Sequence, residues 1–314
     1  MAKTLTIFTP AYNRAYTLHL GYEALLQQTC QDFEWLIIDD GSTDNTHELV
    51  EGWIAENKIP IRYHYQENQG MHGAHNTAYR LITTELNTCI DSDDYMPNDA
   101  VEKIITFWKQ YGSDKVAGII GLDADFDGNI IGTQFTEKET TLTGFYARGG
   151  KGDKKLVYRT DIIKRYPEYP IFKGEKYVSL GYKYELIDQD YSLLTINEVL
   201  VNVEYRPDGS SMNMFRQYIK NPQGFAFIRK SSMQLAPTAK RRLMEAIHYV
   251  SSSLILKNKR FIQESPKKLL TLCAIPFGIA LYLFIRFKTR NIQGSASLYP
   301  FIMSLLTFPN VWIR

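Results

Sequence analysis

Residues 35–40 read Trp-Leu-Ile-Ile-Asp-Asp, a short apolar run that ends in two adjacent carboxylates. A second run, 87–90, leads in the same way into Asp91-Ser92-Asp93-Asp94. If both runs are strands of one parallel sheet, both sets of carboxylates lie at its carboxyl edge, where open α/β sheets bind ligands. Carboxylates packed together are costly unless a cation or hydrogen-bond donors meet them. The pattern therefore predicts a divalent metal with a phosphorylated ligand at this edge.

Apolar runs alternate with helical patterns through the first 122 residues. We expect strands at 5–8, 34–38, 61–65, 87–90 and 116–122, and helices at 16–28, 43–54, 74–81 and 101–108. This alternation predicts an α/β fold, a doubly wound and mostly parallel sheet flanked by helices. Residues 123–155, rich in Gly, Thr and Asp, are expected to form hairpins and loops. Two further strands are expected at 193–196 and 199–203.

Charge is distributed unevenly along the 314 residues, although the net charge is only +2. Residues 1–204 hold 19 basic and 31 acidic side chains, whereas 205–290 hold 16 basic and 3 acidic ones. An acidic half suits a metal site, and a basic half suits anions such as ligand phosphates or lipid head groups. Nucleic acid is not among the expected partners.

Residues 269–285 carry no charge and have basic residues on both sides. The stretch is at the short limit for a membrane span, and Pro276 and Gly278 are expected to interrupt it. We interpret 269–314 as an apolar segment that lies on the membrane or re-enters it, with a transmembrane helix and a buried helix as alternatives. Because the chain opens with a strand pattern and no signal peptide, we expect a peripheral or monotopic protein on the cytoplasmic face of the cell membrane.

Three motifs occur in order along the chain: Thr9-Pro-Ala-Tyr-Asn-Arg14, Ile38-Asp-Asp-Gly-Ser-Thr-Asp44 and Asp91-Ser-Asp-Asp94. Together they resemble the family 2 glycosyltransferases of the GT-A fold, of the bacterial cell-surface polysaccharide type. The resemblance implies an inverting, metal-dependent hexosyl- or N-acetylhexosaminyltransferase. Its donor would be a UDP-sugar, and its acceptor a lipid-linked or anionic cell-surface glycan at the inner membrane surface.

The resemblance covers residues 1 to about 210. It implies a GT-A catalytic domain at 1–210, with nucleotide-sugar binding in 1–122 and the acceptor side in 123–210. A basic helical region, 211–268, and the apolar segment from 269 onward follow it.

The resemblance also implies roles for individual residues. Thr9, Pro10 and Tyr12 would line the nucleotide base pocket, with Tyr12 stacking on the ring. Asp40 would accept the uracil N3 proton. The loop that contains Asn68 and Gly70 resembles the family's Gly-rich nucleotide-binding segment.

Further roles concern the diphosphate and the metal. His75 replaces the arginine that usually ends the Gly-rich segment, so a hydrogen bond from its ring would take the place of a fixed charge. Arg206 would neutralise the leaving diphosphate, although an ordinary turn explains its loop equally well. Asp93 would bind Mn²⁺ or Mg²⁺, and Asp91 would contact the ribose, the metal or a metal-bound water.

An inverting transferase needs a base for the acceptor hydroxyl, and the family commonly supplies it from a Glu-Asp pair that is absent here. Glu175 occupies that region and is the predicted base, with Asp188 or Asp190 as alternatives. The missing pair also leaves open a catalytically degenerate, membrane-bound scaffold that binds nucleotide-sugar or glycan. A nucleotidyltransferase is less favoured, because residues 9–14 lack the glycines that would hold a triphosphate.

Overall fold

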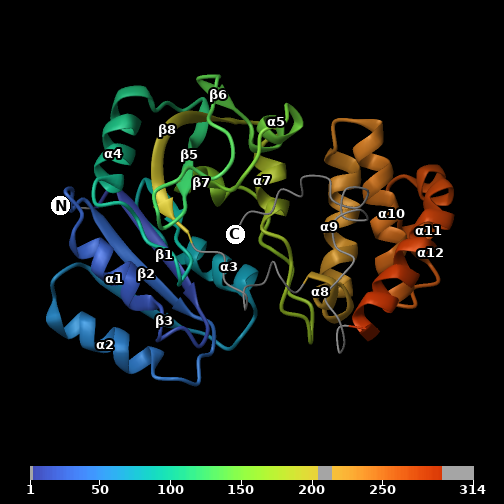
Figure 1. Ribbon diagram of the computed structural model, residues 1–314, viewed down its shortest axis with the longest axis horizontal. Coiled ribbons are helices and arrows are strands. Elements are labelled where there is room, and N and C mark those ends of the chain that lie inside the picture. The colour runs from blue at the N-terminus through green and yellow to red at the C-terminus, as the bar shows by residue number, and fades with distance from the viewer. Residues whose placement is uncertain (1–2, 204–213, 292–314) are drawn as a thin grey trace. The chain divides into compact units, whose positions relative to one another are not determined.

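The computed structural model describes residues 3–203 and 214–291 (Figure 1). These residues divide into two compact units. The first unit holds residues up to 169 together with 186–203, and the second holds 170–185 and 214–291. Arg206, one of the predicted nucleotide-binding residues, lies outside the described residues.

The first unit is built on an eight-stranded sheet whose strands run in the order β3-β2-β1-β4-β7-β5-β8-β6. The strands are β1 (Leu5–Ala11), β2 (Phe33–Asp39), β3 (Ile61–Tyr65), β4 (Leu86–Cys89), β5 (Val116–Ala124), β6 (Glu139–Thr140), β7 (Lys154–Arg159) and β8 (Ser192–Asn202). β1 pairs in parallel with β2 and β4, as do β2 with β3 and β5 with β8. Only β7 and the short β6 run antiparallel. The expected mostly parallel sheet is confirmed, and the carboxyl ends of β2, β4 and β5 meet at one edge.

Helices cover both faces of this sheet. On one face α1 (Leu18–Leu26), α2 (Thr46–Glu56) and α4 (Ala100–Tyr111) share a core with the strands. Tyr22 and Trp53 stack there with ring centroids 4.4 Å apart, and Trp35 of β2 stacks beside them. The other face carries α3 (Met71–Leu81), which packs against β1 and β2. Successive side chains of a strand point to opposite faces of the sheet, so each strand contributes apolar residues to the helices on both faces.

Residues 123–155 hold more regular structure than the sequence indicates. They include β6, α5 (Leu142–Ala147) and the start of β7, which inserts between β4 and β5. β7 continues into α6 (Thr160–Ile163). The two strands expected at 193–196 and 199–203 are one strand, β8, whose register shifts against β5. Because these register shifts interrupt the regular alternation of inward and outward side chains, the sequence pattern of β8 resembles two short strands.

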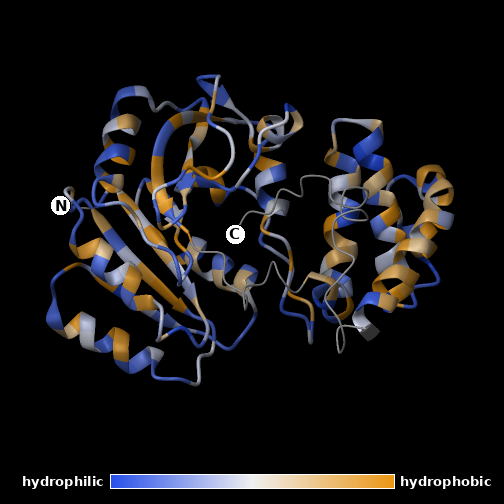
Figure 2. Ribbon diagram, in the orientation of Figure 1, coloured by the Kyte–Doolittle hydropathy of each residue, from blue (hydrophilic) through white to orange (hydrophobic). Residues whose placement is uncertain are grey.

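The second unit is helical, with α8 (Met214–Lys220), α9 (Pro222–Leu235), α10 (Ala239–Ile255), α11 (Phe261–Glu264) and α12 (Lys268–Asn291). α7 (Gly181–Ile187) begins in this unit. Tyr249 and Val250 of α10 form its core with Met233 of α9 and Ala274 of α12. Figure 2 shows that apolar residues predominate along much of α12 and in the central strands.

The expected interruption of the apolar segment is wrong, because α12 continues through Pro276 and Gly278. A Cβ at position 278 would lie 2.5 Å from Val250, so glycine is what lets α10 approach at this point. Residues 268–289 are long and apolar enough to cross a membrane by length and composition, and 28% of the most apolar window is buried against the protein.

Candidate active site

The end of β2 is fixed to the loop that precedes α3. The Asp40 carboxylate accepts hydrogen bonds from Gln66 Nε2 at 2.7 Å and from the backbone N–H groups of Gln69 and Gly70, each at 2.8 Å. Gly41 follows with a φ of +83°, and a Cβ there would lie 2.9 Å from the Asn68 nitrogen. The Asp-Gly sequence thus permits a close approach of two loops that no side chain at position 41 would allow.

Asp40 is 4% exposed and meets three N–H donors from this loop. Asn68 and Gly70, both predicted from the sequence, lie in the same loop. The structure therefore brings Asp40, Asn68 and Gly70 together.

At the end of β1, the Thr9 side chain packs in the core, and the nearby Tyr12 ring is exposed. Thr9 is buried, and its hydroxyl accepts the indole N–H of Trp35 at 3.0 Å. Asn13 Oδ1 accepts the backbone N–H of Thr43 at 2.7 Å, which holds the β1 and β2 loops together. Tyr12 lies between these residues with half of its surface exposed. Its ring is available to a planar ligand, whereas the Thr9 side chain serves the core.

His75, predicted to contact the diphosphate, has no exposed surface. Its ring makes edge contacts with Phe8, Tyr79 and Tyr169 at centroid distances of 4.9, 5.6 and 6.4 Å. Nδ1 lies 3.1 Å from the Tyr79 hydroxyl. In this arrangement His75 packs α3 against the sheet, and a ligand would reach the ring only after a rearrangement.

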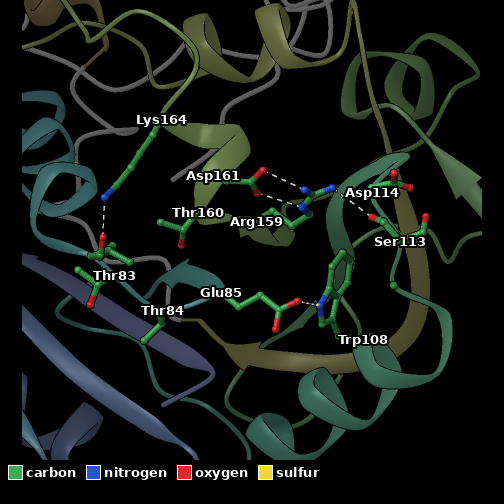
Figure 3. Close-up of a pocket in the computed structure, with 12 residues that line it drawn as sticks. Thr83, Thr84, Glu85, Trp108, Ser113, Asp114, Arg159, Thr160, Asp161 and Lys164 are labelled. Atoms are coloured by element: carbon green, nitrogen blue, oxygen red, sulfur yellow. Dashed lines mark hydrogen bonds and ion pairs between the residues drawn. The ribbon is translucent and has the colours of Figure 1, made fainter. Parts of the chain in front are cut away.

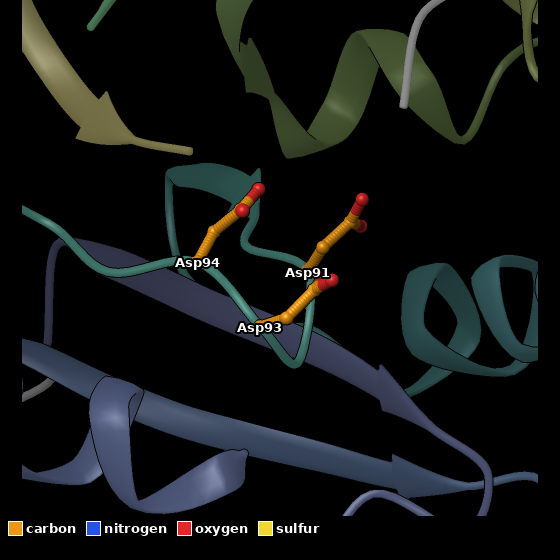
Figure 4. Close-up of side chains that lie close together, drawn as sticks. All are labelled: Asp91, Asp93 and Asp94. Atoms are coloured by element: carbon orange, nitrogen blue, oxygen red, sulfur yellow. The ribbon is translucent and has the colours of Figure 1, made fainter. Parts of the chain in front are cut away.

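Three carboxylates gather directly after β4. Asp91, Asp93 and Asp94 each place an oxygen within 4.8 Å of the others, from one short turn (Figure 4). Asp91 and Asp93 are partly exposed, and Asp94 is buried. Carboxylates this close repel one another unless a cation lies between them, and oxygen ligands of this kind suit Mg²⁺ or Mn²⁺. The donor set therefore fits a divalent ion, with Asp94 as a third carboxylate beside the predicted Asp91 and Asp93.

Sequence reasoning missed two charged residues at the same edge. Asp123, near the end of β5, is 5% exposed, and its carboxyl makes no hydrogen bond or ion pair within the described residues. Burial, with help from the charges of Asp153 and Asp91, raises the pKa of its carboxyl to about 7, despite the opposing effect of Lys155. The Lys155 ammonium, partly exposed, donates to the Cys89 carbonyl at 2.5 Å. Only the pairing of β7 with β4 and β5 brings them together, and no local signal reveals it.

Glu175 belongs to the second unit. Its carboxylate accepts the backbone N–H groups of Gln223 at 2.9 Å and Gly224 at 2.8 Å, at the start of α9. Asp188 likewise accepts from Leu142 and Thr143 at the start of α5, at 3.2 and 2.7 Å. Each carboxylate thus stabilises a helix N-terminus by accepting N–H groups that have no partner within the helix.

A cleft of about 740 Å³ opens at the opposite edge of the sheet, near the residues that precede β4 and β5 (Figure 3). Most of its charged groups already have partners. Arg159 pairs with Asp161 at 2.9 Å, Glu85 accepts the Trp108 indole N–H at 2.7 Å, and Lys164 donates to the Ile82 carbonyl at 2.6 Å. This cleft is therefore a poor candidate for the chemistry.

Comparison with known proteins identifies the family. Residues 6–166 match the family described as Glycosyl transferase family 2, and the chain belongs to it. An uncharacterized glycosyltransferase of Haemophilus influenzae is 32% identical over 174 residues, which are 55% of this chain and 68% of that protein. Chondroitin synthase of Escherichia coli is 35% identical over 127 residues, 40% of this chain but only 18% of the synthase.

Solved structures agree on the fold. The structure of S. aureus TarS 1–349 in complex with UDP-GlcNAc superposes with a TM-score of 0.60 at 19% identity and covers 92% of both chains. The mannosyltransferase PcManGT of Pyrobaculum calidifontis, in complex with GDP-Man and Mn²⁺, superposes with a TM-score of 0.54 at 17% identity, covering 92% of this chain and 84% of its own. The protein is thus a glycosyltransferase with the fold expected from its motifs.

Proposed function

We propose that this glycosyltransferase is an inverting, metal-dependent enzyme that takes its sugar from a UDP-sugar. The observation that carries the proposal is the cluster of Asp91, Asp93 and Asp94, within 4.8 Å of one another at the sheet edge where the Asp40 loop also lies. The UDP-GlcNAc complex of TarS and the Mn²⁺ complex of PcManGT support it, as structures of proteins with the same fold.

The nucleotide is proposed to lie over the ends of β1 and β2. The half-exposed Tyr12 ring stacks on the uracil, Thr9 and Pro10 form the wall of the pocket, and the Asp40 carboxylate accepts the N3 proton. Asn68 and Gly70 present the neighbouring loop to the ribose and phosphates. His75 and Arg206 remain proposed diphosphate contacts.

The metal is proposed to be held by Asp93 and Asp91, with Asp94 as the third carboxylate. When bound, Mn²⁺ or Mg²⁺ supplies positive charge to the departing diphosphate. The carboxylates fix its position, and their number keeps the site selective for hard, oxygen-preferring cations.

Glu175 is proposed as the base. The acceptor oxygen forms a bond to the anomeric carbon, the bond from that carbon to UDP breaks, and the acceptor proton passes to the carboxylate. The two N–H groups that Glu175 accepts orient it and leave further lone pairs on its oxygens. Glu175→Gln should lower the transfer rate by about 100-fold while UDP affinity stays unchanged. Unchanged transfer would refute the assignment, and the thermal midpoint checks that α9 is intact.

The acceptor is proposed to be a lipid-linked or anionic glycan at the cytoplasmic membrane face. α12 supports this, because Leu269, Leu283 and Phe287 expose 80, 58 and 61% of their surfaces between basic residues at both ends of the helix. An exposed apolar face with basic flanks suits a helix that lies in the membrane interface.

Co-sedimentation with vesicles tests the membrane proposal. Changing Leu269, Leu283 and Phe287 to serine should keep the protein in the supernatant when vesicles contain anionic lipid. These side chains contribute little to the folded core, so the fold should persist. Ile171→Ser, at an exposed apolar residue outside α12, is the control and should sediment like the wild type. Equal sedimentation of the triple variant would contradict the proposal.

A further inference from the structure

An aromatic pair lies immediately beyond the carboxylate cluster. Tyr95 directly follows Asp94, and its ring meets that of Phe126 in an edge contact with centroids 4.9 Å apart. Phe126 exposes 38% of its surface, and Tyr95 is partly exposed. The Tyr95 ring also carries a hydroxyl group, which can donate a hydrogen bond. The pair thus offers apolar ring surface together with a hydrogen-bond donor.

Backbone pairing holds this pair in place. Tyr95 exchanges two hydrogen bonds with Asn202 of β8, at 3.1 and 2.7 Å. Asn202 is in register with Ala124, which in turn pairs with Ile130 across the hairpin that carries Phe126. Segments from three parts of the chain therefore hold the backbone that carries the two rings, and a binding surface needs such support.

Asp123 belongs to the same corner of the sheet. It precedes Ala124, and its carboxyl is nearly buried without a hydrogen-bond partner among the described residues. A buried carboxyl without a partner is costly, and such groups in native proteins commonly meet a ligand or a water. Because Oδ1 is enclosed, a ligand would reach the group through Oδ2.

The chemistry of this corner suits a sugar. The Asp123 carboxyl, which lies outside the proposed metal ligands, can accept a hydrogen bond from a hydroxyl group. Aromatic rings offer an apolar surface to the C–H groups of a pyranose. A ligand with hydroxyls on its edge and C–H groups on its face satisfies both.

The order of strands along the edge indicates which sugar lies there. The proposed base pocket belongs to β1 and β2, and the metal cluster follows β4. β5 and β8, which carry the aromatic corner, lie on the far side of β4 from β2. A UDP-sugar that extends from the ends of β1 and β2 to the end of β4 has its diphosphate at the carboxylate cluster. The next position along the sheet edge is therefore open to the acceptor, which attacks the donor sugar.

We propose that Tyr95, Phe126 and Asp123 form the subsite for a pyranose ring of the acceptor, with the rings contacting its face and the carboxyl accepting a hydroxyl. This inference rests on the proposed function. It adds that the part of the acceptor nearest the metal site is a sugar ring.

Ligand-observed NMR tests the subsite with methyl glycosides of glucose, galactose, mannose and N-acetylglucosamine on the full chain, with and without UDP and Mg²⁺. We expect saturation transfer to ring protons of at least one glycoside. Phe126→Ala should weaken its binding about 3- to 10-fold, as expected for loss of one aromatic contact. The control is Tyr111→Ala, because Tyr111 and Phe107 form a pair with the same 4.9 Å centroid distance on α4. It should leave binding unchanged.

Asp123→Asn provides the second variant, and it too should weaken glycoside binding while UDP affinity persists. The inference is overturned if the wild type binds none of the glycosides, or if Phe126→Ala and Tyr111→Ala behave alike. It is also overturned if Phe126→Ala weakens UDP-sugar binding relative to UDP, which would place the donor sugar there. Absence of UDP binding by the wild type would instead refute the proposed function. The glycoside titration would still test the subsite, because it does not depend on UDP.

Discussion

Replacing Asp123 with asparagine should stabilise the metal-free protein increasingly as the pH rises. The carboxyl has an ordinary pKa of 3.8, and burial raises it to about 7 in the folded chain. Between these values the folded state keeps a proton that the unfolded state loses, so the wild type becomes less stable with rising pH. A shift of this size costs about 4 kcal/mol above pH 7, and about 2.5 kcal/mol of it develops between pH 5 and pH 8.

Asparagine removes the titration but leaves a buried amide, whose cost does not depend on pH. The quantity to measure is therefore the change in the stability difference between variant and wild type across pH 5 to 8. Urea unfolding in EDTA, followed by tryptophan fluorescence, suits it because Trp35, Trp53 and Trp108 all report on the first unit. A difference that stays constant across this pH range would refute the account of Asp123 as a buried carboxyl without a partner.

Three further substitutions test the contacts that build the fold and the site. Gly41→Ala should destabilise the first unit by about 1–2 kcal/mol and weaken UDP binding, because φ is +83° and the new Cβ would press on Asn68; urea unfolding and calorimetry would measure the two effects. Thr9→Val should cost about 1–3 kcal/mol in the same unfolding assay, because the Trp35 indole N–H loses its acceptor. Glu245→Gln should lower the stability of the helical unit by about 3 kcal/mol in circular-dichroism melts, because it leaves the largely buried Arg229 without its 2.9 Å ionic partner. An effect below about 0.5 kcal/mol at any of these positions would show that the contact is not needed in solution.

The sequence predicted the architecture of β1 to β5 because the signals there are local. Apolar runs of four to nine residues, ended by Pro10, Gly41 or an acidic turn, identify the strands, and helical spacing identifies the segments between them. The carboxyl edge follows from the parallel order alone. Asp91 and Asp93 lie at this edge in the structure, and their role as metal ligands stays a prediction.

What the sequence did not reveal depends on contacts between distant segments. β7 lies between β4 and β5 although it follows both in the chain, and this insertion brings Lys155 to the Cys89 carbonyl. The burial of His75 likewise depends on Tyr169, which is 94 positions away. Propensity and spacing carry no information on such pairings, so charges and burial at those positions could not be predicted.

The central claim, that the carboxylates after β4 bind a metal with the diphosphate of UDP, is tested most directly by calorimetric titration of UDP with and without Mn²⁺. The wild type should bind UDP in preference to GDP and dTDP, and only with the metal. Asp93→Ala should abolish that dependence. Asp114→Ala, at an exposed carboxylate beside the cleft at the opposite sheet edge, should not. UDP binding that ignores both Mn²⁺ and Asp93 would contradict the account and favour a scaffold that binds nucleotide-sugar without catalysis.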